Sequence, residues 1–374
     1  MHHRPFGATG FAISALGFGA MRLPMARRNG ADHVRFQTAI RMLRHAFDLG
    51  VNYVDTAYGY CNGESEIAVG RALKGYRDRV RLSTKLPLWQ VKKRADFRLL
   101  LDEQLRKLDT DHIDFYHLHG VSAARMKDTV LKFHLIEEAE KAKAKGLIRN
   151  LSFSFHDKPE AMKPIIDTGV FASVLCQYNL LDRSNEKMIA YAKSKGLGVV
   201  VMGPVGGGRL GCPSPVIQRL LGRKAATSAE IALRFVLSNP NVDCALSGMS
   251  APEQVDENVA VASNKNPLTG REHERVNKAM DELKELANLY CTGCAYCMPC
   301  PQDVNIPACF EALNYYRVYK LMDVARGKYN GIGKGWIKGK KADACIACGV
   351  CEAKCPQNIP IRKQLREVQR VFAS

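Results

Sequence analysis

The chain has 374 residues, of which 46% are hydrophobic and 25% charged, and this length suits one domain of roughly 250 residues or more with an appendage. A formal charge of +18 is compatible with nucleic-acid binding, but no basic helix or nucleic-acid motif accompanies it, so we expect a basic soluble enzyme without a nucleic-acid partner. A basic face also suits anionic cofactors or an acidic redox protein. No apolar run of about 18 residues predicts a membrane span, and the start of the chain lacks the pattern of a signal peptide.

The first 265 residues alternate strand-like and helix-like segments after a hairpin over 5–13. Strands are predicted over 15–20, 51–54, 80–83, 113–118, 148–155, 173–178, 197–202 and 242–246. Helices are predicted over 34–49, 65–73, 97–108, 129–145, 158–167, 186–194, 228–238 and 252–262. Eight strands alternating with helices predict an α/β fold, a (β/α)8 TIM barrel. An open doubly wound sheet alternates in the same way, but no Gly-x-Gly-x-x-Gly follows the first strand.

Polar residues end three successive strands of the predicted barrel. Asp55 ends the second strand, and Tyr60 follows it five residues later; Lys85 ends the third strand and His119 the fourth. Catalytic groups collect at the carboxyl ends of barrel strands, so we expect these four side chains to form one site. Strand alternation places His117 on the same face as His119. Because His119 is nearer the carboxyl end, we assign it to the site and expect His117 to be structural.

The four groups suit the reduction of a carbonyl compound. An unperturbed phenol has a pKa of about 10, and a nearby Lys85 cation is expected to lower the pKa of Tyr60 and make it a better proton donor. Asp55 would hold Lys85 in place, and His119 would hydrogen-bond the carbonyl oxygen. Taken singly, each residue has a structural explanation as well: a helix cap, a packed loop aromatic or a solvated lysine.

At these residues the chain resembles the aldo-keto reductase family, over about residues 4 to 265. The resemblance lies in Asp-Thr-Ala-x-x-Tyr at 55–60, the lysine at 85 and Asp-x-Ile-Asp-x-Tyr-x-x-His at 111–119. It implies that these Asp, Tyr, Lys and His residues are the catalytic tetrad, with the tyrosine as proton donor. It also implies an NADP or NAD cofactor that lies extended across the barrel mouth.

The same resemblance implies a set of residues that bind the cofactor. They are Gly19, Ala20, Met21, Asp55, Ser154, Gln177, Met202, Gly203, Pro204, Val205, Gly207, Gly248, Ser250, Gln254, Glu257 and Asn258. Phe155 and Met202 depart from the residues most common in the family at their positions. The run Gly206-Gly207-Gly208 follows the seventh strand, where many barrels bind a phosphate; a flexible loop is the alternative. The sequence leaves the choice between NADP and NAD open.

A change of composition near residue 286 predicts a second domain over 286–374, after a barrel domain over 1–285 and a charged exit helix over 272–290. Eight of the 13 cysteines lie in two motifs of this domain. The motifs are Cys291-x2-Cys294-x2-Cys297-x2-Cys300-Pro301 and Cys345-x2-Cys348-x2-Cys351-x3-Cys355-Pro356. The second matches the bacterial ferredoxin run. We therefore predict two [4Fe-4S] clusters in a reducing cytoplasm; two zinc sites are the alternative.

In two-cluster ferredoxins the cysteine before the proline ligates the other cluster. The predicted ligand sets are therefore Cys291, Cys294 and Cys297 with Cys355, and Cys345, Cys348 and Cys351 with Cys300. Apolar residues at helical spacing between the motifs predict a small, mainly α-helical ferredoxin-like domain; they are Ile306, Phe310, Leu313, Leu321 and Val324. A barrel joined to such a domain resembles a bacterial and archaeal subfamily of these oxidoreductases.

Two functions compete at this point. The first is an NAD(P)-dependent oxidoreductase that reduces an aldehyde or ketone. The second is an electron-transfer module in which the barrel is a docking scaffold and the clusters serve another redox protein. A hydride carries two electrons and a cluster passes one, and no flavin motif is visible to connect them. Turnover and cluster reduction, measured separately, would distinguish the two functions.

Overall fold

The computed structural model describes residues 1–28, 30–180, 182–206, 227–264, 268–282, 291, 293–317, 322–335 and 337–372. The chain divides into two compact units. One comprises Met1–Gly208 and Ala229–Thr269, and the other Arg209–Ser228 and Gly270–Ser374. In the described part of the chain, no helix has both the length and the apolar character needed to cross a membrane.

The first unit is a closed barrel of eight parallel strands, as the sequence predicts. The strands are β3 (Leu16–Gly19), β6 (Tyr53–Asp55), β7 (Arg81–Leu86), β8 (Ile113–Val121), β9 (Ile148–Phe155), β10 (Ser173–Gln177), β11 (Gly198–Met202) and β12 (Cys244–Gly248). Each pairs with the next along the chain, and β12 closes on β3. All the catalytic candidates at strand ends therefore share one rim of the barrel.

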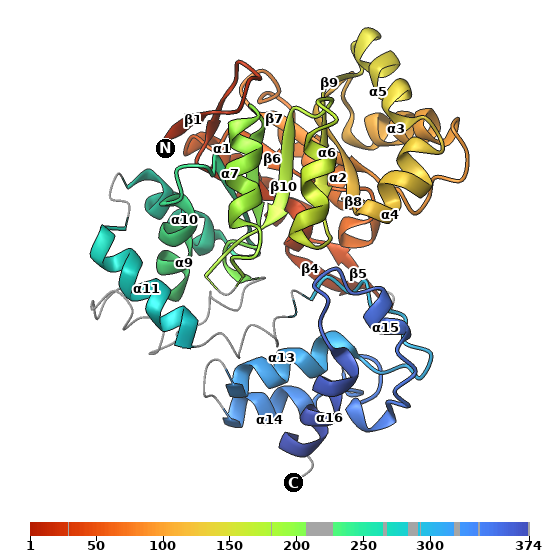
Figure 1. Cartoon of the computed structure of the whole chain (residues 1–374), viewed down its shortest axis with the longest axis vertical. Helices are drawn as coiled ribbons and strands as arrows, with labels where there is room; N and C mark the ends of the chain where they lie inside the picture. Colours follow the sequence, from red (N-terminus) through yellow and green to blue (C-terminus); the bar gives the residue numbers. More distant parts are fainter. Residues whose placement is uncertain are drawn as a thin grey trace. The chain divides into compact units, whose positions relative to one another are not determined.

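Helices surround these strands on the outside (Figure 1). They are α1 (Phe36–Asp48), α2 (Ser65–Leu73), α3 (Asp96–Leu108), α5 (Leu135–Ala144), α6 (Met162–Ile166), α7 (Glu186–Ser194), α9 (Ser228–Leu237) and α10 (Pro252–Ser263). In α1 the buried residues Ala39, Met42, Leu43, Ala46 and Phe47 recur at helical spacing, so one stripe faces the barrel.

The amino-terminal hairpin, β1 (His3–Pro5) and β2 (Ala12–Ser14), closes the end of the barrel opposite the candidate site. Phe6 is fully buried, and its ring centroid lies 5.0 Å from that of Phe115 at the start of β8. A Cβ atom at Gly198 would lie 2.3 Å from the Phe6 ring, so only glycine fits there. The barrel is thus a packed core that the hairpin closes at one end.

Two local features differ from the sequence predictions. The helix expected over 129–145 is interrupted: a π-helical turn over Met126–Leu131 precedes α5, and His134 between them has a φ of +53°. A hairpin of β4 (Met25–Arg28) and β5 (Ala31–Val34) was not predicted, because these short strands are polar and lack alternation. Tertiary contacts stabilise this hairpin: Glu64 accepts hydrogen bonds from the Val34 backbone at 2.7 Å and contacts His33 at 2.8 Å.

The second unit is mainly helical, as expected. Its helices are α11 (Gly270–Glu282), α13 (Ile306–Arg317), α14 (Met322–Asn330), α15 (Val350–Ala353) and α16 (Ile361–Phe372). Helices α13, α14 and α16 pack around a core that includes Phe310, Leu313, Leu365 and Val368 (Figure 1). The exit helix predicted over 272–290 is described as far as Glu282, and the rest of that prediction lies outside the described residues.

Candidate active site and cluster sites

Asp55 and Lys85 form a buried ion pair at the carboxyl ends of β6 and β7. Lys85 Nζ lies 2.5 Å from Asp55 Oδ1 and also donates to the Thr56 carbonyl at 2.7 Å. The second carboxylate oxygen accepts a hydrogen bond from Ser83 Oγ at 2.8 Å. The exposed fractions of the Asp55 and Lys85 side chains are 2% and 1%. Burial raises the pKa of Asp55, and the Lys85 ammonium opposes that rise.

Tyr60 lies on the loop after β6, with its ring beside this pair. The Lys85 Nζ is 4.8 Å from the Tyr60 ring centroid, a cation–π distance. Cys61 and Asn62 have φ values of +52° and +57°, which turn the loop sharply after Tyr60. Burial raises the pKa of Tyr60 above its usual value, and the Asp55 carboxylate adds to the rise.

This direction corrects the sequence expectation, which had Lys85 lowering the pKa of Tyr60. The charge of Lys85 is matched by the Asp55 carboxylate, so it favours the phenolate less than a lone cation would. Tyr60 therefore stays protonated at neutral pH, and a protonated phenol is the form that can donate.

His119 completes the group from the end of β8. Its ring is edge-on to Tyr60, with 6.1 Å between ring centroids, and lies 4.9 Å from the ring of Trp89. Burial, followed by the Lys85 charge, lowers the pKa of His119 well below its usual value, so the ring is neutral. His117 lies deeper, with Nε2 3.4 Å from the Tyr53 hydroxyl, as expected of a structural histidine. Sequence reasoning missed Trp89, although its position just after β7 could have suggested a place at the rim.

The expected cofactor residues lie along the same rim. The register pairs Gly19 with both Asp55 and Gly248 across β3, β6 and β12, and Gln177 with Met202 across β10 and β11. The others follow these strands in sequence: Ala20 and Met21 after β3, Pro204 and Val205 after β11, and Ser250, Gln254, Glu257 and Asn258 after β12. Ser154, near the end of β9, accepts a hydrogen bond from the Gly120 backbone at 2.7 Å. Gly207 lies outside the described residues.

Two backbone features suit an extended ligand on this rim. Gly203 has a φ of +63°, and a Cβ atom there would lie 2.6 Å from Gln177 Nε2, so the glycine lets the amide lie flat beside the chain. At the start of α10, Gln254 Oε1 accepts hydrogen bonds from the Ser250 and Ala251 backbone, at 2.8 and 3.3 Å. Gln254 therefore orders the turn that the resemblance places at the adenosine.

Arg22 is a cation on this rim that sequence reasoning missed. It ends the short helix η1 (Ala20–Arg22) after β3 and is exposed. Three carbons of its side chain lie 3.5 to 3.6 Å from the position that a Cβ atom at Gly248 would occupy. An arginine is thus packed along the loop after β12, close to the residues expected to bind phosphate groups.

The two cysteine motifs of the second unit repeat each other in backbone conformation. Gly293 and Ala295 flank the second cysteine of the first motif with φ values of +67° and +62°. Ala347 and Gly349 flank the second cysteine of the other motif with +57° and +79°. The repeat includes the turns after the Cys-Pro pairs: the Asp303 backbone donates to Cys300, and that of Asn358 donates to Cys355.

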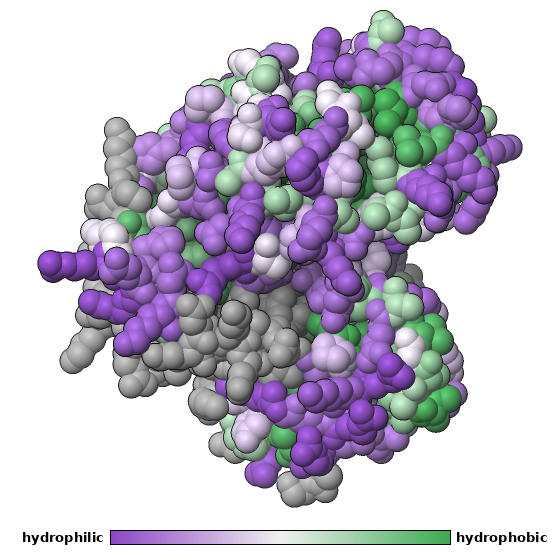
Figure 2. Space-filling model, viewed as in Figure 1, coloured by the Kyte–Doolittle hydropathy of each residue, from purple (hydrophilic) through white to green (hydrophobic). Residues whose placement is uncertain are grey.

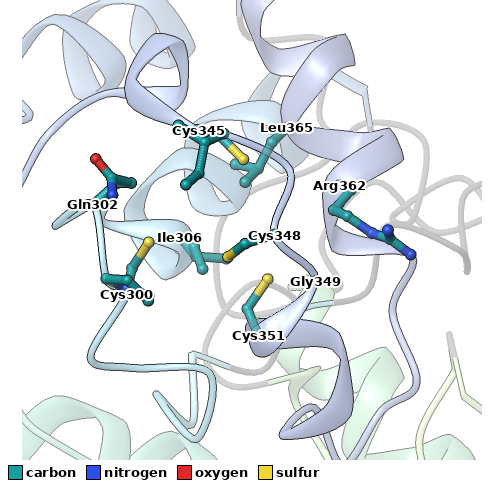
Figure 3. A pocket seen from close by; sticks show the side chains of 11 residues that line it. Cys300, Gln302, Ile306, Cys345, Cys348, Gly349, Cys351, Arg362 and Leu365 are labelled. Carbon is teal, nitrogen blue, oxygen red and sulfur yellow. The ribbon is translucent and has the colours of Figure 1, made fainter.

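One predicted ligand set lines a single small pocket. In Figure 3 the sulfur atoms of Cys300, Cys345, Cys348 and Cys351 face a common space, and Ile306 borders it. Cys300 comes from the first motif and the other three from the second. The structure therefore brings together the four residues of one predicted ligand set, in which the cysteine before the proline of the first motif joins three cysteines of the second.

The other predicted set is also gathered. Burial raises the pKa of the Cys297 thiol, and the nearby Cys291, Cys294 and Cys355 raise it further, so the four lie close to one another. Among the residues that the structure describes, no group of three His, Cys, Asp or Glu side chains is arranged to hold a single metal ion. Four soft thiolates facing one space fit an iron–sulfur cluster, which is larger than one ion.

Comparisons with known proteins cover both parts of the chain. The model of the aldo/keto reductase family matches residues 15–211, and that of a 4Fe-4S dicluster domain matches residues 290–359. "Uncharacterized oxidoreductase YqkF" of Bacillus subtilis is 28% identical over 73% of this chain and 94% of its own length. "L-galactose dehydrogenase" of Arabidopsis thaliana is 29% identical over 76% of this chain and 95% of its own length.

Solved structures of the family share the barrel. The holo form of aldo-keto reductase AKR11C1 from Bacillus halodurans is 29% identical, with a TM-score of 0.64, over 75% of this chain and 96% of its own. An aldo/keto reductase from Klebsiella pneumoniae in complex with NADP and acetate is 28% identical, with a TM-score of 0.62, over 74% of this chain and 94% of its own. The chain therefore belongs to the aldo/keto reductase family and is an NAD(P)-dependent oxidoreductase with a 4Fe-4S dicluster domain in its C-terminal part.

Proposed function

We propose that the protein reduces an aldehyde or ketone with hydride from NAD(P)H, with Tyr60 as the proton donor. The observation that carries this proposal is the convergence of Asp55, Tyr60, Lys85 and His119 on one barrel rim. The bound dihydronicotinamide supplies the hydride to the carbonyl carbon. Tyr60 gives its proton to the carbonyl oxygen, so the products are an alcohol and the oxidised cofactor, and a solvent proton restores the phenol.

Each of the other three residues supports that proton transfer. Neutral His119 hydrogen-bonds the carbonyl oxygen and orients it toward Tyr60. The Lys85 ammonium, over the ring face of Tyr60, stabilises the phenolate that the transfer leaves. Asp55 fixes Lys85 through the 2.5 Å contact and keeps the site close to neutral overall.

Residues on the adjacent strands are proposed to hold the cofactor. Ser154 and Gln177, at the ends of β9 and β10, are of the right chemistry to bind a carboxamide through hydroxyl and amide groups. Gly203 leaves room for the approach of a ligand. Arg22 is proposed to pair with a phosphate of the cofactor. NADP in the Klebsiella pneumoniae structure and the name "NADH-specific methylglyoxal reductase" of an Escherichia coli relative support NADP and NAD respectively.

We further infer that the second unit holds two [4Fe-4S] clusters, with Cys291, Cys294, Cys297 and Cys355 as one ligand set and Cys300, Cys345, Cys348 and Cys351 as the other. The cavity shared by the second set supports this assignment. Clusters of this kind pass single electrons. Thiolate ligands also favour a reducing compartment, and we propose the cytoplasm.

Exposure near the second set favours a role of the clusters in electron exchange with a partner. Cys348 is exposed, and Ile346 and Val350 beside it are 64% and 42% exposed. Figure 2 shows apolar surface where α15 lies. From 291 to 372 the chain has 13 lysines and arginines against six aspartates and glutamates, which suits an acidic redox protein. An electron-transfer module is therefore the second candidate function.

Two variants distinguish the candidates. Tyr60→Phe removes the proton donor and is expected to lower kcat for carbonyl reduction by roughly 10²–10⁴-fold. Tyr58→Phe is the matched control, because the Tyr58 hydroxyl donates to Glu103 at 3.1 Å instead of facing the site. Turnover that survives in Tyr60→Phe, measured anaerobically with NADPH and NADH, would reject the proposed reductase.

The clusters are tested separately. Cys300→Ser and Cys355→Ser are expected to remove different clusters, each lowering bound iron by about half, with Cys309→Ser as a control because Cys309 is buried outside both motifs. Iron analysis and the visible absorption band provide the readouts. Loss of the same cluster in both variants would contradict the ligand sets. Reduction of the clusters by an acidic redox protein, independent of Tyr60, would favour the electron-transfer module.

A further inference from the structure

The segment after His119 brings an arginine to the catalytic rim. Strand β8 continues past His119 through Gly120 and Val121, with a register shift against β9. Gly120 has a φ of +69°, and its N–H donates to Ser154 Oγ at 2.7 Å. The short helix α4 (Ala123–Arg125) then begins with Ser122, whose Oγ accepts from the Arg125 backbone at 3.1 Å.

The next strand also anchors this turn to the barrel. Asp157, just after β9, accepts a hydrogen bond from the Ala123 backbone at 2.8 Å. With both ends of the turn fixed, the Arg125 side chain folds back over the rim, and its Nη1 donates to the Gly120 carbonyl at 2.8 Å. The guanidinium is therefore held one residue away from the proposed carbonyl-binding histidine.

His156 lies beside the same glycine. A Cβ atom at Gly120 would lie 2.6 Å from Arg125 Nη1 and 3.8 Å from His156 Cδ2. Any larger residue would displace Arg125, so the glycine permits this close packing. Both basic side chains thus lie next to the backbone that follows His119, and both are partly buried.

The two cations of the rim, Lys85 and Arg125, differ in whether a carboxylate neutralises them. Lys85 is matched by Asp55 at 2.5 Å. Of the carboxylates in the described part of the chain, none is placed within ion-pair distance of the Arg125 guanidinium, and the nearby Asp157 carboxylate accepts from backbone N–H groups. A partly buried guanidinium with one hydrogen bond to a carbonyl keeps several N–H donors for a ligand. Such a fork matches the oxygens of a carboxylate or phosphate.

We propose that Arg125, with His156 beside it, binds an anionic group of the substrate, so that the enzyme prefers carbonyl compounds carrying a carboxylate or a phosphate close to the reacting carbonyl. The inference rests on the proposed reductase function and deepens it. The anion pairs with Arg125 while the carbonyl oxygen faces Tyr60 and His119. The remote ion pair orients the substrate and gives the selectivity that a purely apolar pocket lacks.

The test compares paired aldehydes that differ in whether an anionic group is present. Succinic semialdehyde is paired with butanal, and glyceraldehyde 3-phosphate with glyceraldehyde, and kcat/KM is measured for each under anaerobic conditions. In the wild type the anionic member of at least one pair is expected to be preferred. Arg125→Ala is expected to lower the ratio of the two kcat/KM values by roughly 10–100-fold, the loss expected for one charged hydrogen-bonded contact. The pair with the larger change identifies the anion as carboxylate or phosphate.

Two further variants protect the interpretation. Arg125→Lys keeps the charge without the fork and is expected to restore part of the ratio. Arg98→Ala is the matched control, because Arg98 pairs with Asp102 on the outer helix α3 at 2.7 Å, and it should leave the ratio unchanged. A wild type without preference for the charged substrates, or an Arg125→Ala variant in which both substrates lose equally, overturns the inference. Failure to reduce either member of either pair, by contrast, rejects the reductase function itself.

Discussion

Separating the buried pair Asp55–Lys85 is expected to destabilise the barrel strongly, and more than removing the whole pair. Asp55→Asn leaves the Lys85 ammonium almost fully buried with the Thr56 carbonyl as its hydrogen-bond acceptor. Lys85→Met leaves a buried carboxylate with one hydrogen bond, from Ser83. Breaking a buried pair by removing one partner costs about 3–5 kcal/mol. The double variant buries neither charge, so its loss should be well below the sum of the two single losses.

The magnitude follows from burial and distance. Both side chains are at most 2% exposed and their charged atoms are 2.5 Å apart, so solvent screens the pair little. An interaction energy of at least 2 kcal/mol is therefore expected from the double-mutant cycle. The surface pair Lys74–Asp109 is the control, since its atoms are 2.7 Å apart but its side chains are 62% and 66% exposed. Removing its two partners is expected to give nearly additive effects.

The assay is urea unfolding of the full chain under argon, followed by fluorescence. The chain has two tryptophans, so a Trp336→Phe background leaves Trp89, beside His119, as the reporter of the barrel. Single losses below about 1 kcal/mol that add without interaction would refute the argument that burial makes this pair different from the surface pair. Loss of activity alone would not decide the matter, because the proposed chemistry uses both residues.

Two further predictions concern pH. Burial and the Asp55 carboxylate raise the pKa of Tyr60, so the phenol keeps its proton as the pH rises. The rate of carbonyl reduction should therefore not fall through loss of that proton until the pH exceeds the ordinary phenol pKa of about 10. A pH profile of kcat that falls near pH 8 in the wild type but is flat in Tyr60→Phe would contradict this. Burial, with Arg125 and Lys85, lowers the pKa of His156 to about 4. The unfolded chain therefore takes up this proton first, so stability is complete above about pH 6.5 and declines as pH falls toward 4, by roughly 1–3 kcal/mol. His156→Gln should remove that part of the decline in urea titrations at pH 7 and pH 4.5, and an unchanged decline would count against the assigned cause.

The second pH effect bears on the proposed anion site as well. A neutral His156 donates one hydrogen bond and leaves Arg125 as the fixed charge of that side of the rim. Protonation of His156 in acid would add a second charge there. An anionic ligand bound at the rim would oppose the loss of stability in acid, because it stabilises the protonated ring.

The reactions proposed for the clusters and for the barrel site are different in kind. Hydride transfer moves two electrons together, whereas a [4Fe-4S] cluster exchanges one. The exposed surface beside Cys348 is the proposed place at which the clusters exchange electrons with a partner. We therefore expect loss of the clusters to alter electron exchange with other proteins more than it alters carbonyl reduction.

The amino-acid sequence by itself determined the barrel and the order of its strands, and it predicts the cluster ligands. Strand and helix periodicity are local properties, and parallel strands of a closed barrel have their carboxyl ends on one rim. Strand order alone therefore predicts that Asp55, Lys85 and His119 lie together. The spacing of the cysteines likewise reflects how far a short loop can reach around one cluster, and the backbone of the two motifs repeats accordingly.

Only the tertiary structure decided the electrostatics and the contacts between segments distant in sequence. The rise in the pKa of Tyr60 depends on burial and on which partner neutralises Lys85, and no sequence pattern contains that balance. Arg22 reaches the loop after β12, and Arg125 folds back on Gly120, because hydrogen bonds and packing between different strands direct those side chains. Long flexible side chains have many rotamers of similar energy, so their positions are determined by their neighbours in the folded chain.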